Sequence, residues 1–268
     1  MKKEDMKSEG DSLKNDAPSL VAASSTIDKA LLEEIMVAGV LYGRKKSKTN
    51  PKMRKYIHST RNGFQIFDAE KIMDLGHRAE DFLKLTASKG GSFLVVGTEA
   101  HHKEPVKAFA LKLGIPNIAN RWLGGILTNF KTLNQRIQYY LKLKSDLETG
   151  RLDKYTKKER VQFGKDAERL EKLFSGLENF TKIPNVLIVV GATSHMTAVK
   201  EAKKLKIPVV AIVSTDCDPE LVDYIFPGND KAKSSVAWIL DRFASAIEQG
   251  VREMKANVVA NPSPEVKK

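Results

Sequence analysis

A tryptophan and two glycines lie directly before a long helical pattern, in the stretch Asn120–Thr132 (NRWLGGILTNFKT). Arg121 supplies a cation and Trp122 a flat ring on which a base can stack, while the glycine pair allows close backbone approach. Asn129 and Lys131 add an amide and a second cation at the start of the helix, where anions bind well. These residue types suit RNA, although Trp122 could also be a core residue beside a glycine turn.

Glycine motifs typical of nucleotide enzymes are missing. Gly97 follows the apolar run at 93–96, and doubly wound folds bind ligands at such strand ends. Yet this corner has no G-x-G-x-x-G, and the chain has no G-x-x-x-x-G-K-[ST]. A lone glycine there more often serves backbone geometry. The competing hypothesis is an α/β enzyme or binding protein for a nucleotide or sugar phosphate, which would use Gly97, Thr98 and Gly191.

The histidines, the cysteine and the acidic cluster do not form a catalytic or metal pattern. The histidines lack the i, i+4 spacing with a glutamate that zinc proteases use. Ser194, His195 and Cys217 could be drawn as nucleophiles and a base, but their spacing gives no support. The run at 216–220 could hold magnesium, whereas Asp218 before a proline is more typical of a helix N-cap. We therefore predict no catalytic residue, no metal and no cofactor.

The charge of the chain favours a polyanionic partner. Lys and Arg number 45 against 33 Asp and Glu, a formal net charge of +12. Two stretches contain no acid, one between Glu34 and Asp68 and one between Glu104 and Asp146, and a solvated lysine-rich face is the alternative interpretation of each. The residues that we expect to contact RNA are Arg44, Lys45, Lys46, Lys48, Lys52, Arg54, Lys55, Arg61, Arg121, Trp122, Asn129 and Lys131.

Composition narrows the class of protein further. A single cysteine, Cys217, excludes an internal disulfide framework and a Cys-rich zinc site. No apolar run approaches the roughly 18–20 residues of a membrane span, and the first ten residues are polar and mixed in charge. We therefore expect a cytoplasmic protein without a membrane segment.

Apolar strand-like runs alternate with helical periods along the chain. The runs at 64–67, 93–96, 186–190 and 208–213 are followed or separated by helical patterns near 69–88, 99–113, 196–205 and 231–249. Strands that are apolar on both faces and alternate with helices are typical of a mostly parallel sheet covered on both sides. The sequence predicts a three-layer α/β domain.

One segment, 127–182, interrupts the alternation. Apolar residues recur there every three or four positions on both sides of a turn near 149–153, which predicts two antiparallel helices. Their length and charged faces favour a coiled-coil hairpin that projects from the sheet domain, and the alternative is that both lie flat on it. The expected organisation is a disordered tail at 1–25, a discontinuous sheet domain at 26–126 and 183–250, the hairpin at 127–182 and a disordered tail at 251–268.

Several motifs together resemble the small ribosomal subunit protein two family of bacteria and organelles. In family order they are NPKM at 50–53, FLVVGT at 93–98, RWLGG with LTN at 121–129 and PGND at 227–230, and the resemblance covers about residues 30–250. It implies a flavodoxin-like or Rossmann-like domain with an inserted coiled-coil hairpin. It also implies a structural protein bound to small-subunit ribosomal RNA in the cytoplasm or an organelle. The implied protein partners include the large RNA-binding protein numbered one, and no catalysis is implied.

The chain departs from the family pattern at three places. The family's Gly-Val-His-Phe-Gly-His corresponds to 39–44, which ends here in Arg44. Gly191 stands where the family has an aspartate, and the family's Asp-Thr-Asn corresponds to Ser-Thr-Asp at 214–216. These changes remove imidazoles and carboxylates and add a guanidinium, a direction that we expect to suit contact with RNA.

Overall fold

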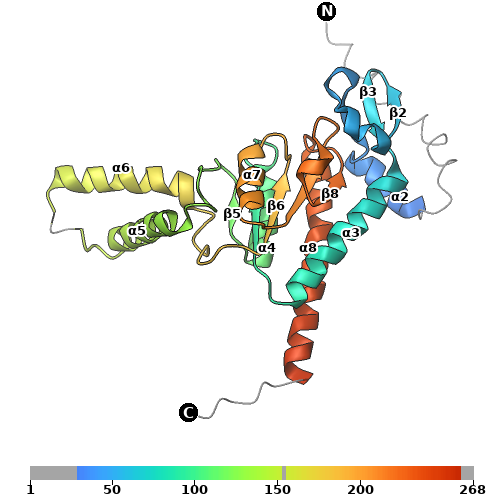
Figure 1. The fold of residues 1–268 in the computed structure, drawn as a ribbon. Helices are drawn as coiled ribbons and strands as arrows, with labels where there is room; N and C mark the ends of the chain where they lie inside the picture. The colour runs from blue at the N-terminus through green and yellow to red at the C-terminus, as the bar shows by residue number, and fades with distance from the viewer. Residues whose placement is uncertain (1–28, 153–154, 261–268) are drawn as a thin grey trace, which may run out of the picture.

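A parallel sheet of five strands forms the centre of the molecule in the computed structural model, which describes residues 29–152 and 155–260 (Figure 1). The strand order is β5-β4-β6-β7-β8, and every neighbouring pair is parallel. All residues of β4, β6 and β7 are buried, which confirms the predicted α/β class. The strands are β4 (Phe93–Val96), β5 (Asn117–Ile118), β6 (Val186–Val190), β7 (Val209–Val213) and β8 (Tyr224–Pro227).

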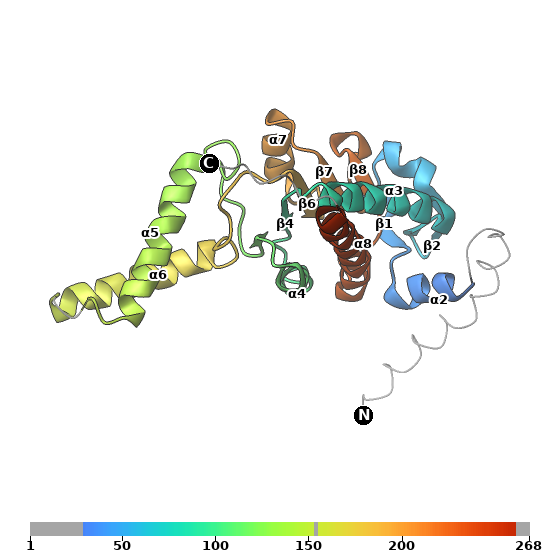
Figure 2. The ribbon, with the colours of Figure 1, turned by 90° about the horizontal axis from the view of Figure 1, so that it is seen from below.

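Helices cover both faces of this sheet. Figure 2 shows α7 (Met196–Lys204) on one side and α4 (Lys103–Leu113) with α8 (Lys233–Ala260) on the other. The helix α3 (Ala69–Ser88) packs against α8 and β8. The helices α3, α4 and α7 lie within a few residues of their predicted positions, because the apolar period that buries one face of a helix is visible in the sequence. The helix α8 begins close to its predicted start but extends well beyond its predicted end at 249.

A second sheet of three antiparallel strands lies at one end of the molecule. Its order is β1-β3-β2, built from β1 (Tyr42–Lys45), β2 (Ile57–Arg61) and β3 (Phe64–Phe67). The strand predicted at 64–67 therefore forms, but it does not join the parallel sheet as we expected. Asn62 and Gly63 both have positive φ, 47° and 80°, and an Asn-Gly pair favours the tight hairpin turn that joins β2 to β3.

Shorter elements surround this small sheet. The helix α2 (Lys29–Ala38) precedes β1, and its Leu32 and Ile35 are buried. Two 3₁₀ helices, η1 (Lys46–Lys48) and η2 (Pro51–Tyr56), connect β1 to β2. Much of the acid-free stretch between Glu34 and Asp68 therefore consists of short connecting segments. Most of its lysines and arginines are exposed on these segments.

Two helices project from the parallel sheet at the opposite end from the small sheet (Figure 1). The helix α5 (Phe130–Glu148) runs outward and α6 (Lys157–Phe174) returns, and Figure 2 shows that they cross obliquely. A capping box between Thr156 and Glu159 begins α6. The two predicted helices are present and project; their packing as a coiled coil stays a prediction.

The ends of the chain differ in part from expectation. The predicted C-terminal tail begins at 251, but α8 continues to Ala260, and residues 261–268 lie outside the described part. The predicted N-terminal tail at 1–25 also lies outside it. Within the described residues, none of the helices has the length and apolar character needed to cross a bilayer.

Candidate RNA interface

The carboxyl edge of the parallel sheet, where an α/β enzyme would bind its ligand, is filled by the chain's own groups. The backbone N–H of Thr98 donates to Nε2 of His195 at 3.0 Å, and Nδ1 of His195 donates to the carbonyl of Gly191 at 2.9 Å. Gly191 has a φ of +75°, and a Cβ there would lie 3.1 Å from Cε1 of His102. The three positions assigned to a nucleotide in the competing hypothesis are therefore occupied or bonded internally.

Gly97 has a role in backbone geometry and close packing, as the sequence indicated. A Cβ at Gly97 would lie 2.8 Å from Cγ2 of Val106 and 3.1 Å from Cβ of His102. The glycine is required because α4 packs closely against the end of β4. It marks a packing constraint at this corner.

Arg44 lies beside this edge and points inward. Its guanidinium lies 2.9 Å from Oδ1 of Asp230 and 3.4 Å from Oδ2 of Asp216, and its side chain is 19% exposed. Burial raises the pKa of Asp230 to about 6, while the positive charge of Arg44 opposes that rise. Arg44 is thus neutralised within the fold, which weakens its selection as an RNA contact. The absence of acids near Arg44 in the sequence did not indicate these two carboxylates, because Asp216 and Asp230 lie 172 and 186 positions later in the chain.

A group that could hold a metal ion lies next to these residues. Among residues 29–152 and 155–260, ligand atoms of Glu99, His101 and His102 come within 4.8 Å of one another. Burial favours a raised pKa for Glu99, but bonds from Lys231 and Ser194 lower that pKa to about 2. Because the Lys231 ammonium already supplies the positive charge beside this carboxylate, we assign no metal to the group.

The acidic run at 216–220, considered above as a magnesium site, instead caps a helix and pairs with a lysine. The carboxylate of Asp218 accepts from the backbone N–H of Glu220 at 3.1 Å and caps the 3₁₀ helix η3 (Pro219–Leu221). Nζ of Lys52 lies 3.0 Å from Oδ2 of Asp218 and also bonds Glu220. Lys52, another predicted RNA contact, is therefore partly neutralised.

The tryptophan–glycine corner is organised by Glu201, a residue of α7 that the sequence interpretation missed. Its Oε1 accepts from Nε1 of Trp122 at 3.0 Å and from the backbone N–H of Gly125 at 2.8 Å. Its Oε2 accepts from the backbone N–H of Leu127 at 3.2 Å and from the N–H and hydroxyl of Thr128 at 3.4 and 3.3 Å. Burial favours a raised pKa for Glu201, but these donors outweigh it and hold the pKa below its ordinary value.

This carboxylate occupies the place that an anion would take at the corner. The backbone N–H groups of Gly125 and Leu127 bind Glu201, and Trp122 is half-buried against the core. Gly125, with a φ of +93°, allows the turn around the carboxylate. Trp122 therefore supports the corner from within, as the alternative interpretation held, and no local pattern around position 201 could have identified its partner.

The cations of the corner remain on the surface. Arg121 and Lys131 are exposed, and no ion pair joins either to an acid within the described residues. The Asn129 side chain is exposed at the N-cap of α5 and makes no capping bond, while its backbone N–H donates to the carbonyl of Gly125 at 2.7 Å. We call Arg121, Asn129 and Lys131 the corner surface.

A second cationic surface lies on the small sheet and its connections. Nζ of Lys45 lies 5.8 Å from the ring centre of Phe64, and Nζ of Lys55 lies 4.9 Å from that of Tyr56. Arg61, at the end of β2, is half-buried. We call the exposed cations here the N-terminal basic surface; they are Lys45, Lys46, Lys48, Arg54 and Lys55.

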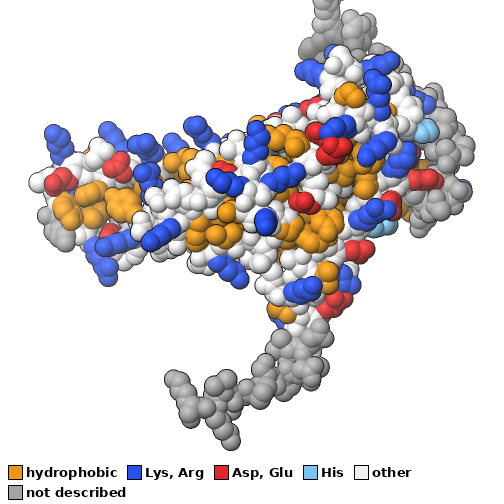
Figure 3. Space-filling model, in the orientation of Figure 1, with side chains coloured by type: hydrophobic (Ala, Val, Ile, Leu, Met, Phe, Trp, Pro, Cys, Tyr) orange, Lys and Arg blue, Asp and Glu red, His pale blue; other side chains and the backbone are white. Residues whose placement is uncertain are grey.

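The two surfaces lie at opposite ends of the parallel sheet, because the small sheet lies beside β8 and the corner leads into α5 (Figure 1). Figure 3 shows Lys and Arg side chains over the small sheet at one end and over α5 and α6 at the other. The twelve predicted contact residues thus divide into the two surfaces, three inward-facing or paired side chains, and one half-buried cation at the end of β2. The three side chains are Arg44, Lys52 and Trp122, and the half-buried cation is Arg61.

Comparison with known proteins identifies relatives that match most of the chain. Residues 35–250 match the family described as ribosomal protein S2. The small ribosomal subunit protein uS2 of Dictyoglomus turgidum is 40% identical over 230 residues, which cover 85% of this chain and 94% of that protein. The protein of the same name from Thermus thermophilus is 40% identical over 87% of this chain and 89% of its own length. That of Mycobacteroides abscessus is 36% identical over 87% and 84%.

Proposed function

The chain belongs to the ribosomal protein S2 family, and from this premise we infer that it is a structural protein of the small ribosomal subunit and not an enzyme. Its role in translation follows from that place. It associates with the small subunit, which consists of ribosomal RNA and other ribosomal proteins.

The observation that carries the RNA part of this function is the corner surface. Arg121 and Lys131 stay exposed and without a carboxylate partner in the described part of the chain, while the turn beneath them is fixed by Glu201. Cations on a rigid support suit the phosphate backbone, because little conformational freedom is lost when they bind. We propose that the corner surface and the N-terminal basic surface each contact ribosomal RNA.

The residues that we assign to RNA contact differ from the set expected from sequence. Arg44 and Lys52 are assigned to pairing within the fold, and Trp122 to support of the corner. Arg61 is kept as a contact at the edge of the small sheet. The proposed contacts are Lys45, Lys46, Lys48, Arg54, Lys55, Arg61, Arg121, Asn129 and Lys131.

The relatives and the surface of α2 support our proposals on compartment and partners. The three named relatives are bacterial, which supports a bacterial cytoplasmic ribosome over an organellar one. Val37 on α2 is 89% exposed, so α2 presents apolar surface to which a neighbouring protein could bind. The family resemblance supports the large RNA-binding protein numbered one as a neighbour.

Sedimentation of the tagged full-length chain tests the proposed function. We expect the chain to co-migrate with small subunits in a gradient at moderate salt. Its affinity for purified small-subunit RNA should fall steeply with salt, by roughly 0.7 to 0.9 in the logarithmic slope per phosphate contacted. A chain that stays at the top of the gradient, or that binds RNA equally well at low and high salt, would contradict the proposal.

A further inference from the structure

A cavity opens between the corner and the two projecting helices. Its volume is about 540 Å³, within the range of roughly 300–1,000 Å³ typical of sites for small ligands. The corner contributes Leu123 and Gly124, α5 contributes Arg136 and Tyr139, and α6 contributes Arg169 with apolar neighbours. A Cβ at Gly124 would meet no atom within 4 Å, so the backbone there faces open space.

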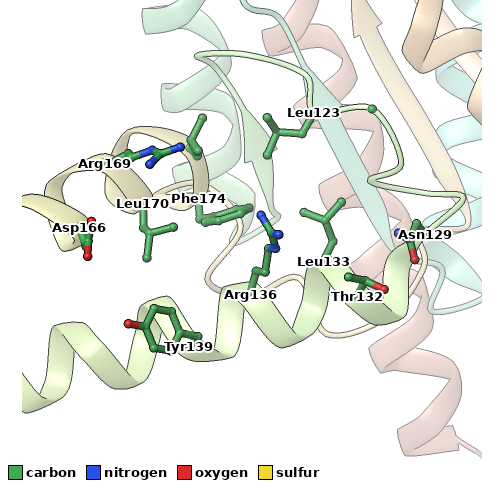
Figure 4. A pocket seen from close by; sticks show the side chains of 12 residues that line it. Leu123, Asn129, Thr132, Leu133, Arg136, Tyr139, Asp166, Arg169, Leu170 and Phe174 are labelled. Carbon is green, nitrogen blue, oxygen red and sulfur yellow. The ribbon is translucent and has the colours of Figure 1, made fainter. Parts of the chain in front are cut away.

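Two arginines on different helices face this cavity. Figure 4 shows Arg136 of α5 and Arg169 of α6 on either side of Phe174. Both are exposed, and within the described residues no ion pair neutralises either of them. Asp166 lines the same cavity and accepts from Nε2 of Gln162 at 3.3 Å, so the cavity keeps an excess of one positive charge. Paired guanidinium groups match the oxygens of a phosphate better than those of a neutral ligand.

The floor of the cavity is apolar and aromatic. Phe174 is 2% exposed and fixes the floor, with Leu133 and Leu170 beside it. Tyr139 stands at the rim, where it is 53% exposed and offers a ring face to solvent. Stacking of a base on such a ring contributes about 1–3 kcal/mol, and it suits any base because every base has a flat face.

Building on the proposed function, we propose that this cavity takes one unstacked nucleotide of an unpaired segment of ribosomal RNA. The base stacks on Tyr139 at the rim and lies over the apolar floor of Phe174 and Leu170, and the adjoining phosphate binds Arg136 and Arg169. The cavity holds about one nucleotide and is too small for a duplex. Specific recognition of RNA is directed mostly at splayed bases in loops and bulges.

The position of the cavity supports RNA over a peptide as the occupant. Its mouth is continuous with the corner surface, because Asn129 belongs to both. An RNA strand that contacts Asn129 on the corner surface is therefore at the mouth of the cavity. A peptide would gain the apolar floor but would need an acidic group to use both arginines, whereas each nucleotide carries a flat apolar face and an anion together.

Photo-crosslinking in intact subunits tests the inference, with a benzophenone amino acid placed at Tyr139. We expect a crosslink to one discrete ribosomal RNA nucleotide that is unpaired. The variant Arg136→Gln with Arg169→Gln should remain in the subunit, because the proposed contacts elsewhere are intact, but should lose most of that crosslink. A matched control, Lys142→Gln with Lys158→Gln, removes the same charge from α5 and α6 outside the cavity and should keep it.

The affinity of the full chain for a fluorescent single-stranded RNA hexamer measures how much Tyr139 contributes to binding. Tyr139→Ala should weaken binding by roughly 5- to 150-fold, which corresponds to about 1–3 kcal/mol of stacking. Because Tyr139 is half-exposed, its loss should leave the unfolding midpoint nearly unchanged.

The outcomes separate this inference from the proposed function. A crosslink from position 139 to a protein chain, to paired RNA only, or to nothing would overturn the inference while the chain still sediments with subunits. Equal loss of the crosslink in the control double variant would also overturn it, because general charge would then explain the contact. A chain that does not enter subunits at all would overturn the proposed function first.

Discussion

Arg44 and Arg121 both lie in acid-free stretches of the sequence, yet the fold treats them in opposite ways. Arg44 is 19% exposed and lies between Asp216 and Asp230, whereas Arg121 is exposed beside a turn whose own carboxylate, Glu201, is used internally. We infer from this difference that a cation is available to contact RNA only where the fold brings no acid to it. The local sequence shows only the neighbours of Arg44 along the chain, whereas the edge of the sheet brings it next to Asp216 and Asp230, which lie 172 and 186 positions later.

The largest effect should follow from replacing Arg44 by Met. This change leaves the nearly buried carboxylate of Asp230 without its cation, so the free energy of unfolding should fall by about 3 kcal/mol in urea titration. Burial already raises the pKa of Asp230 to about 6, so the loss should be smaller in mild acid, where the carboxyl becomes protonated. Lys46→Met, on the exposed η1, is the control and should change stability by less than about 0.5 kcal/mol. Equal losses of stability from the two changes would contradict the claim that Arg44, unlike the exposed cations, is paired within the fold.

Glu201→Gln should destabilise the corner by about 2 kcal/mol. The amide keeps one acceptor oxygen but turns an NH₂ group toward donors that had shared a carboxylate. Urea unfolding and the fluorescence of Trp122, whose Nε1 bonds Glu201, both report the change. Glu168→Gln on the exposed face of α6 serves as a comparison. A Glu201→Gln protein as stable as the wild type would mean that the turn is held by its packing alone.

Acid should remove the contribution of Glu201 in a defined direction. Its folded pKa lies below the unfolded value of 4.5, so the unfolded state binds more protons in that window. The stabilisation is therefore fully present above about pH 5 and is lost as the pH falls through the folded pKa. The difference in unfolding free energy between wild type and Glu201→Gln should stay constant near neutrality and shrink below the unfolded pKa. A difference that grows in acid would show the opposite shift.

The smallest effect on stability, with a clear effect on binding, is expected for Arg121→Gln. The free energy of unfolding should change by less than about 0.5 kcal/mol, because the side chain is exposed. The logarithmic salt slope for RNA binding should fall by roughly 0.7 to 0.9, equivalent to one phosphate contact. Lys89→Gln, an exposed charge at the end of α3, should leave the slope unchanged. An unchanged slope for Arg121→Gln would remove this residue from the interface.

The sequence predicted the elements that bury continuous apolar patterns. The strands at 93–96 and 186–190 and the helix at 69–88 were placed closely, because burial on one or both faces imposes a local period. The short strand β5 was missed, since two residues carry no period. The strand at 64–67 was assigned to the wrong sheet, although the Asn-Gly turn before it favoured a hairpin.

The candidate site was predictable in its residue types and not in their partners. The glycine turn beside Trp122 is present, and the RNA contacts predicted there stay a prediction. The residue that organises the turn lies on α7, more than seventy positions later. The inward orientation of the Arg44 side chain likewise depends on a residue far along the chain, Asp230. Contacts of this kind arise from the order of strands in the sheet, which no single window of sequence contains.

Parallel crosslinking from positions 121 and 44 in intact small subunits tests the central claim most directly. A benzophenone amino acid at position 121 should crosslink to ribosomal RNA, and one at position 44 should crosslink only within the protein, provided that both variants enter subunits in equal amounts. RNA crosslinks from position 44 together with none from position 121 would contradict the assignment of the exposed corner as the RNA-facing surface and of the paired arginine as internal.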